Sequence, residues 1–250
     1  MIITISKNAA ELGAAAARFA GARLREAVAR NGEARLVLST GSSQFETLAA
    51  LLKENVDWPK TDIFHLDEYV GLPITHKASF RKYLKERFID FIECRNFHSV
   101  DTEGDIAKTI ADLTDEIRKK PVDVGLIGIG ESGHIAFNDP PADFDTREAF
   151  IVVSLDERCK RQQVGEGWFQ SVDEVPEQAV SMTVWQIMQC RTIVSAVPHL
   201  VKADALYKTL SSGLSNMIPA TMLKQHVDFS LFIDRNSASK VMTFSTSGDR

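Results

Sequence analysis

Short apolar segments alternate with longer alanine-rich or amphipathic segments along most of this chain, and this alternation restricts the fold more than any other feature. The apolar segments predict strands at 35–39, 62–66, 122–129, 149–154, 191–197 and 228–233. The periodic segments predict helices at 8–30, 45–53, 80–92, 105–119, 175–189, 199–211 and 219–225. Strands separated by helices of about ten residues or more pair in parallel, with helices on both faces of the sheet. Because no repeat or linker interrupts the pattern, we expect one α/β domain over residues 1–250 with a mostly parallel sheet.

The composition is typical of a globular protein and narrows the classes of function. Of the 250 residues, 44% are hydrophobic and 25% are charged, which excludes a disordered chain. The net charge of -5 disfavours a general nucleic-acid binder, although it allows a local basic pocket. Three widely separated cysteines without a CxxC pair predict free thiols in a reducing compartment. Charges interrupt the amino-terminal segment and no apolar run reaches membrane length, so we expect a cytoplasmic protein without a membrane partner.

Ligands of parallel α/β sheets bind beyond the carboxyl ends of the strands, so the loops at those ends form the candidate site. The first such loop is Ser39–Ser43, which consists of small hydroxyl residues and glycine ahead of a predicted helix. Its backbone N–H groups are suited to hold a phosphate at the helix N-terminus. An ordinary N-cap turn uses the same residue types, so this loop alone leaves both interpretations open.

Two adjacent carboxylates, Asp67 and Glu68, follow the second predicted strand. A carboxylate at the end of a buried strand can serve as a general base. The alternative is a solvated acidic turn, which Gly71 and Pro73 would close.

The loop after the third predicted strand contains Gly128, Gly130 and Gly133, which match the GxGxxG pattern of dinucleotide-binding proteins. A dinucleotide-binding unit needs a long helix directly after the glycines. The prolines at 140–141 leave room for about two helical turns at most. We therefore expect no dinucleotide-binding unit in this fold.

The same glycine-rich loop presents His134 and, five residues later, Asp139. A histidine can move protons near neutral pH and an aspartate can orient it or act beside it. A structural histidine beside a turn aspartate is the alternative. No pair of histidines has metal-ligand spacing, and neither a GxSxG nor a Walker motif occurs. The residues therefore predict proton chemistry on a small anion, with no metal and no nucleotide cofactor.

Three segments, taken in order, resemble the glucosamine-6-phosphate deaminase family, which belongs to a superfamily that also includes 6-phosphogluconolactonase. These segments are Thr40–Ser43, Phe64–Pro73 and Gly128–Pro140, and weaker similarity continues to about residue 240. The resemblance implies a Rossmann-like α/β domain and a reaction without a cofactor. In that reaction an amino-sugar phosphate, glucosamine 6-phosphate, is opened, isomerised from aldose to ketose, and deaminated to fructose 6-phosphate and ammonia.

The resemblance also implies roles for individual residues. Asp67 would move the proton between C2 and C1 of the sugar. His134 would assist ring opening, with Asp139 in the place of a supporting carboxylate. The residues implied to bind the phosphate group are Gly41, Ser42, Ser43 and Lys202. Without the resemblance, Lys202 would be interpreted as a solvated surface lysine.

Departures from the family pattern lie beside the predicted histidine. Ser132 stands where many members have an aspartate directly before Gly-His, and a hydroxyl cannot stabilise an imidazolium by charge. The neighbouring Glu131 is the carboxylate that could take over this role. Asp139 replaces a glutamate and is one methylene shorter, and a misplacement of about 1 Å can lower a rate on the order of a hundredfold.

The segment 158–169 lacks an arginine at the place where the family binds phosphate. Arg161 is the nearest candidate for that role. Glycines at 165 and 167 and the pair Trp168–Phe169 are compatible with a hinged lid, or with a surface loop that buries both rings. After the histidine loop only Arg147 occupies the region where hexameric members respond to an acetylated sugar phosphate, so we expect no activation by that compound.

Two other functions stay open from the sequence. A lactonase acting on a sugar-phosphate lactone shares the glycine loop and the histidine. Lactonase relatives tend to have Asp-Glu-Arg and Thr-Ala-Ser segments where this chain has Asp67–Tyr69 and Ile135–Asn138. A non-catalytic sugar-phosphate sensor would fit the changes at positions 132 and 139, although no DNA-binding region is evident. The sequence leaves open whether the chain forms a homo-oligomer and which amino-sugar phosphate it takes.

Overall fold

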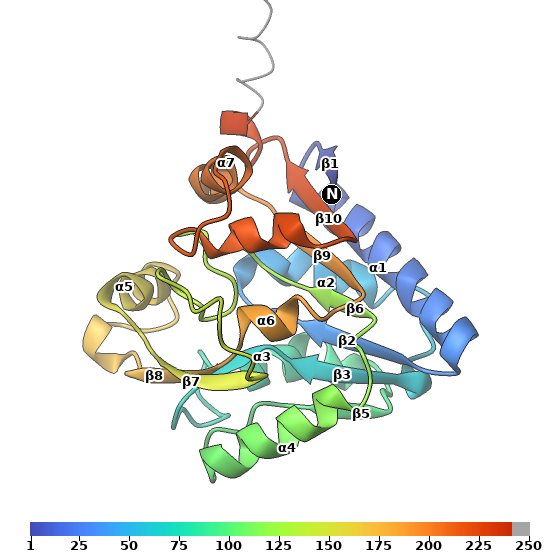
Figure 1. Ribbon diagram of the computed structural model, residues 1–250, viewed down its shortest axis with the longest axis horizontal. Helices are drawn as coiled ribbons and strands as arrows, with labels where there is room; N and C mark the ends of the chain where they lie inside the picture. The colour runs from blue at the N-terminus through green and yellow to red at the C-terminus, as the bar shows by residue number, and fades with distance from the viewer. Residues whose placement is uncertain (242–250) are drawn as a thin grey trace, which may run out of the picture.

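A twisted parallel sheet runs through the centre of the computed structural model, which describes residues 1–241 (Figure 1). Within these residues the sheet has seven strands, in the spatial order β1 (Ile2–Ser6), β10 (Phe229–Asp234), β9 (Thr192–Val197), β6 (Val124–Leu126), β2 (Ala34–Leu38), β3 (Thr61–His65) and β5 (Asn96–His98). All neighbouring strands pair in parallel. This arrangement confirms the predicted α/β class. Residues 242–250 of the predicted domain lie outside the described part of the chain.

A smaller antiparallel sheet lies beside the central sheet, next to α5 (Figure 1). Its strands are β4 (Asp67–Tyr69), β8 (Gln178–Met182) and β7 (Phe150–Ser154). The chain passes from β3 into β4 with only Leu66 between the two strands. Asp67 therefore stands at the junction of the two sheets, at the carboxyl end of β3.

Helices cover both faces of the central sheet. Successive strand side chains point to opposite faces, so each face carries an apolar cluster against which helices pack. On β2, Leu36 and Leu38 pack in one cluster, whereas Val37 packs in the other. The helices of the first cluster are α1 (Ala9–Asn31), α2 (Phe45–Leu51) and α3 (Phe80–Arg87). The helices of the second cluster are α4 (Ile106–Arg118), α6 (Val184–Ile187) and α7 (Ala203–Ser211). The inner strands are thus shielded on both sides, whereas the edge strand β1 stays largely exposed, and the carboxyl ends are left for loops.

A third apolar cluster joins the small sheet to α5 (Glu157–Gly165). Tyr69 of β4 lies at its centre and contacts the rings of Phe80, Phe137 and Phe169. Short 3₁₀ turns complete the described chain, and these are η1 (Ser42–Gln44), η2 (Trp58–Lys60), η3 (Ile89–Phe91), η4 (Val172–Glu174), η5 (Leu200–Lys202) and η6 (Pro219–Gln225). Among residues 1–241, no helix combines the length and the apolar character that a membrane span requires.

The structure corrects part of the sequence-based secondary structure. The helix predicted at 175–189 is wrong, since this stretch forms β8 and the short helix α6. Pairing of β8 with both β4 and β7 outweighs the local helical pattern. The strand predicted at 122–129 is confined to β6, because the chain leaves the sheet early to form the glycine loop. Strands β1, β4 and β5 and helix α5 are absent from the predictions, and three of these four elements have five residues or fewer.

Gly13 determines how closely α1 approaches α2. A Cβ atom at this position would lie 2.6 Å from the backbone carbonyl carbon of Glu46, which cannot move without shifting α2. We expect Gly13→Ala to lower the free energy of unfolding by about 1–3 kcal/mol, although alanine favours the helix. Urea unfolding measures this change. Gly21→Ala is the matched control on the same helix, because its Cβ would meet only the side chain of Glu54, at 3.1 Å. Equal stability of the two variants would contradict this account of the helix contact.

Candidate active site

The carboxyl ends of the central strands surround a cavity of about 190 Å³. The three loops predicted to carry the site all line it. They contribute residues 39–43 after β2, Asp67 after β3, and residues 128–131 and His134 after β6. Lys202, at the end of η5 after β9, lines the cavity as well. The parallel sheet thus brings together groups from distant parts of the chain, because its strands all end at the same edge.

Asp67 is buried, with 5% of its surface exposed, and its Oδ1 atom has no hydrogen-bond partner within residues 1–241. Burial and, second, the nearby Glu68 carboxylate raise the pKa of Asp67 to about 8. At neutral pH its charged form therefore needs a neighbouring positive charge. A carboxylate with this environment is suited to exchange protons with a ligand.

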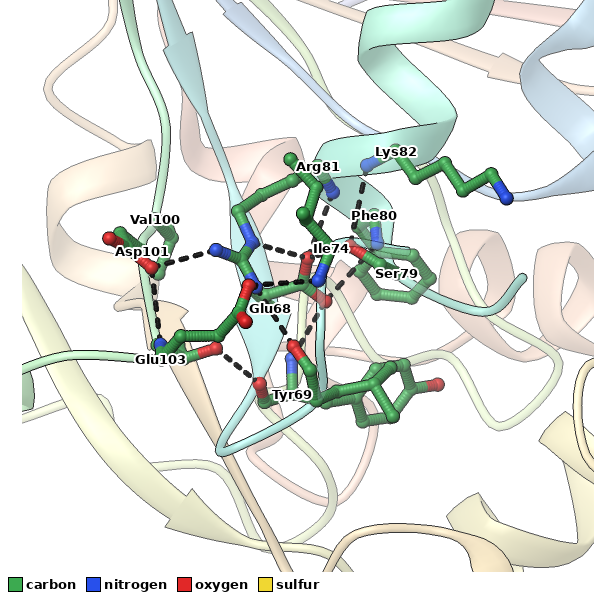
Figure 2. Close-up of polar contacts among 12 residues, drawn as sticks. Glu68, Tyr69, Ile74, Ser79, Phe80, Arg81, Lys82, Val100, Asp101 and Glu103 are labelled. Atoms are coloured by element: carbon green, nitrogen blue, oxygen red, sulfur yellow. Dashed lines mark hydrogen bonds and ion pairs between the residues drawn. The ribbon is translucent and has the colours of Figure 1, made fainter. Parts of the chain in front are cut away.

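Glu68 does not line the cavity, although the sequence placed it near the site. Successive strand side chains face opposite sides, so Glu68 points away from Asp67 into the protein. Its carboxylate accepts hydrogen bonds from Ser79 Oγ at 2.7 Å and from the backbone N–H groups of Phe80 and Arg81 at 3.1 and 2.9 Å (Figure 2). Glu68 is therefore a structural residue that fastens β4 to the start of α3.

The guanidinium of Arg81 completes this buried network (Figure 2). It contacts Glu68 at 3.2 Å and extends to Asp101 at 2.7 Å and Glu103 at 2.9 Å. It also donates a hydrogen bond to the carbonyl oxygen of Leu72. A buried charge is tolerated when its partners satisfy it, so this network determines where β4, and with it the Asp67 backbone, can lie.

His134 lies against two of the three neighbours that the sequence analysis considered, Ser132 and Asp139, whereas no contact with Glu131 occurs within the described residues. Its Nδ1 atom is 3.1 Å from Asp139 Oδ1 and 2.7 Å from Ser132 Oγ. Asp139 therefore reaches the imidazole in spite of its shorter side chain. Burial raises the pKa of Asp139, but the hydrogen bond and the charge of His134 outweigh it, and the pKa lies below its usual range. Because a carboxylate only accepts, Nδ1 carries the hydrogen, and Nε2 is the nitrogen left to exchange a proton.

Glycines give the histidine loop its shape. A Cβ atom on Gly130 would lie 1.9 Å from His134 Nε2, so only glycine allows the imidazole to occupy this position. Gly133 has a φ of +84°, and its carbonyl oxygen accepts a hydrogen bond from the Ala220 N–H at 2.8 Å. Asn138 holds the other end of the loop by donating to the carbonyl oxygen of Met182 at 2.9 Å.

The serine loop is held from two sides. Gln44 Nε2 lies 3.0 Å from Ser43 Oγ and donates to the carbonyl oxygen of Ala196 on β9 at 3.1 Å. The hydroxyl of Tyr83 donates to the carbonyl oxygen of Gly41 at 2.8 Å. The backbone of Gly41, with a φ of +99°, turns the chain into η1 and α2. Ser42 lines the cavity between these two anchored residues, as an anion-binding loop requires.

Lys202 is buried, and the interpretation of a solvated surface lysine is wrong for it. Burial lowers the pKa of the Lys202 ammonium, whereas the carboxylates of Glu166 and Glu131 oppose this change. Both carboxylates line the same cavity, so Glu131 faces the lysine end of the site as well as belonging to the histidine loop. An anion that binds here would restore the charge balance of the lysine.

Arg161 does not line the cavity and forms an exposed ion pair with Glu157 at 3.3 Å on the outer side of α5. Helix periodicity explains this, since the same helix turns the next two residues, Gln162 and Gln163, toward the cavity. Among residues 1–241, we therefore find no support for Arg161 as an anion ligand.

The segment after α5 carries the aromatic pair Trp168–Phe169, for which the sequence analysis left two interpretations open. Trp168 lines the cavity and donates its Nε1 hydrogen to Glu166 Oε2 at 3.1 Å. Phe169 is buried against Tyr69, as the interpretation of a loop that buries its rings expects for this residue, and the hinged lid stays a prediction. The Lys77 ammonium donates to the carbonyl oxygen of Gly167, which ties this segment to the loop before α3.

Within the described residues, no group of three or more His, Cys, Asp and Glu side chains is arranged to hold a metal ion. The cysteines are all free thiols. His199 is a further cavity residue that the sequence analysis missed, because a lone histidine after a strand carries no motif.

Comparison with known proteins identifies the family of this chain. Residues 7–231 match the model of the family described as glucosamine-6-phosphate isomerases/6-phosphogluconolactonase. A glucosamine-6-phosphate deaminase of Clostridium novyi is 34% identical over 214 residues, which cover 82% of this chain and 87% of that protein. A glucosamine-6-phosphate deaminase of Streptococcus agalactiae is 31% identical over 227 residues, covering 87% of this chain and 92% of that protein.

Solved structures of a deaminase and of a lactonase share this fold. The structure of a monomeric glucosamine-6-phosphate deaminase superimposes with a TM-score of 0.87 at 28% identity, covering 96% of this chain and 100% of that one. A 6-phosphogluconolactonase from Trypanosoma brucei superimposes with a TM-score of 0.79 at 18% identity, covering 96% and 98%, which shows the fold alone. By sequence match and by fold, this chain belongs to the family of glucosamine-6-phosphate isomerases and 6-phosphogluconolactonases.

Proposed function

We propose that the protein is a glucosamine-6-phosphate deaminase, which converts glucosamine 6-phosphate and water to fructose 6-phosphate and ammonia. The observation that carries the proposal is the set of side chains that line one cavity. A buried aspartate of raised pKa, Asp67, shares it with His134, which Asp139 supports, and with the buried cation Lys202. The two curated deaminases described above, at 31–34% identity, support the same activity.

The phosphate group anchors the substrate in this mechanism. Gly41, Ser42 and Ser43 offer N–H groups and hydroxyls, and Lys202 offers a positive charge. Phosphate is remote from the reacting carbons, so its binding orients the sugar and lowers the entropic cost of reaction.

Ring opening comes first, and His134 is the residue proposed for it. A proton must leave the C1 hydroxyl and another must reach the ring oxygen. His134 Nε2 can exchange these protons while Nδ1 stays bound to Asp139. The carboxylate of Asp139 stabilises the imidazolium by charge, and Ser132 adds a hydrogen bond.

Proton transfer between carbons follows, and Asp67 is its proposed base. The substrate carries an ammonium on C2, which is the carbon that loses the proton. Binding therefore brings a positive charge toward Asp67 and favours its carboxylate form. Asp67 removes the C2 proton and returns it to C1, while the C2 ammonium gives one proton to the aldehyde oxygen at C1. This yields the iminium form of the 2-keto sugar with a C1 hydroxyl. Water then adds at C2, and ammonia leaves.

The same family includes 6-phosphogluconolactonases, so hydrolysis of a sugar-phosphate lactone is the alternative activity. A sugar-phosphate sensor without turnover is the second alternative. We also propose that the protein acts in the cytoplasm on a small sugar phosphate, without a nucleic-acid or membrane partner.

The decisive assay incubates the purified protein with glucosamine 6-phosphate and measures ammonia and fructose 6-phosphate together. We expect equal amounts of both products. Asp67→Asn and His134→Gln should each lower kcat by about 10²–10⁴-fold, because each removes a proton-transfer group. Hydrolysis of 6-phosphogluconolactone instead would identify a lactonase, and binding without any product would identify a sensor.

The raised pKa of Asp67 also predicts how stability depends on pH. The folded protein holds a proton on Asp67 up to about pH 8, whereas the unfolded chain releases it near its ordinary pKa of 3.8. The stabilisation from this group is complete below the unfolded pKa and is lost as pH rises from about 4 to 8, by at most about 1.4 kcal/mol per pH unit. Asp67→Asn should therefore gain stability relative to the wild type between pH 5 and 8 in urea unfolding. A constant difference between the two proteins would contradict the raised pKa.

Gly130→Ala tests the position of the catalytic imidazole. Its Cβ would overlap His134 Nε2, so the ring must move, and we expect kcat to fall about a hundredfold or more while the protein stays folded. Gly128→Ala is the matched control in the same loop, since its Cβ would come no closer than 3.4 Å to another atom, Gln44 Nε2. Similar activity of the two variants would show that His134 is not in its working position.

A further inference from the structure

His199 has a backbone conformation that residues other than glycine rarely adopt. Its φ is +78° and its ψ is 146°, which is close to a region occupied essentially by glycine alone. It stands between β9 and η5, three residues before Lys202, and it lines the candidate active-site cavity. Strained residues of this kind cluster at ligand-binding sites, where the surrounding structure holds them in place.

The backbone of His199 is fixed from both sides. Its N–H donates to Asp234 Oδ2 at 3.3 Å, and its carbonyl oxygen accepts the N–H of Lys202 at 3.1 Å. Asp234 is itself held by Ser237, whose N–H donates to Asp234 Oδ1 at 2.7 Å. The preceding residue is Pro198, whose ring restricts the chain further. The strained conformation is therefore built into the end of β9.

The imidazole of His199 takes no part in holding this conformation. Within residues 1–241 it makes no hydrogen bond, ion pair or ring contact, and only backbone atoms of His199 are bonded. A glycine would adopt the same backbone without strain. Within the described residues, no polar or ring contact of the side chain therefore accounts for a histidine at this cavity-lining position.

The position of His199 points to the phosphate end of the cavity. Gln44 joins Ser43 of the serine loop to Ala196 of β9, three residues before His199. Lys202 follows on the same turn, η5. Asp67, by contrast, enters the cavity from the small sheet. Arg161 lies outside the cavity, so within residues 1–241 the arginine that the sequence analysis considered does not reach this end.

We propose that His199 is a phosphate-binding residue, whose imidazole N–H donates a hydrogen bond to the phosphate group of the substrate beside Lys202. The inference deepens the proposed function and rests on it for the identity of the sugar phosphate. Imidazole has an N–H donor in both its neutral and its charged form, so it is suited to an anionic oxygen. The strained backbone keeps a histidine at the cavity wall, where glycine would offer no side-chain donor.

The test compares His199→Gly with His199→Ala. Both variants lose the imidazole, but only glycine relieves the strain, because alanine keeps a Cβ atom at positive φ. We expect KM for glucosamine 6-phosphate to rise about 10- to 100-fold in both variants, with kcat changed less than about threefold. We expect the Tm to rise by about 2–4 °C in His199→Gly and to stay within about 1 °C of wild type in His199→Ala. Leu200→Ala is the control, since Leu200 is an exposed neighbour that does not line the cavity.

Two results would overturn the inference. An unchanged KM in both histidine variants would mean that the imidazole does not touch substrate. A KM that rises only in His199→Gly would mean that loosening of the turn, rather than loss of the imidazole, weakens binding.

Calorimetric titration with inorganic phosphate separates this inference from the proposed function. A wild-type protein without deaminase activity would refute the proposed function. Weaker phosphate binding by both histidine variants, with Leu200→Ala unchanged, would still support His199 as an anion ligand. Equal phosphate binding by the wild type and His199→Ala would refute that role whichever sugar phosphate is the substrate.

Discussion

The buried ion pair between Glu68 and Arg81 is the interaction on which the candidate active site depends most. Glu68 is fully buried, and hydrogen bonds from Ser79, from the start of α3 and from the guanidinium satisfy its carboxylate (Figure 2). Removal of one partner from such a pair leaves an uncompensated buried charge, at a cost of about 3–5 kcal/mol. The network therefore holds β4 in one position, and the alternation of strand side chains then presents Asp67 on the opposite side, to the cavity.

Charge is divided within this cavity in a way that matches an amino-sugar phosphate. The serine loop, Lys202 and His199 gather donors after β2 and β9, with the Glu131 and Glu166 carboxylates also acting on Lys202, whereas Asp67 brings a carboxyl group from the small sheet. A ligand with a phosphate on one side and an ammonium near its reacting carbons complements both groups. Burial strengthens this complementarity, because it disfavours the charged forms of Asp67 and Lys202 until a ligand supplies the opposite charge.

The errors of the sequence analysis share one cause, which is the lack of information about long-range contacts. The segment 175–189 contains helical spacing, yet Gln178–Met182 forms the central strand of the small sheet, since two distant strands pair with it. Arg161 has the right charge for phosphate, but the turn of α5 directs it to solvent. Without the family resemblance, local sequence would have left Lys202 as a surface lysine, and tertiary packing buries it.

Sequence by itself determined the parallel α/β class, the three loops at the strand ends, and the candidate pair His134 and Asp139. Each of these follows from local periodicity or from short motifs, which can be recognised without knowing which distant residues are in contact. Only the tertiary structure decided that burial raises the pKa of Asp67, that Glu68 belongs to the framework, and that His199 lines the cavity in a strained conformation. The pKa of a carboxyl group and the cost of a backbone angle depend on burial and on contacts between distant segments, and folding alone creates these.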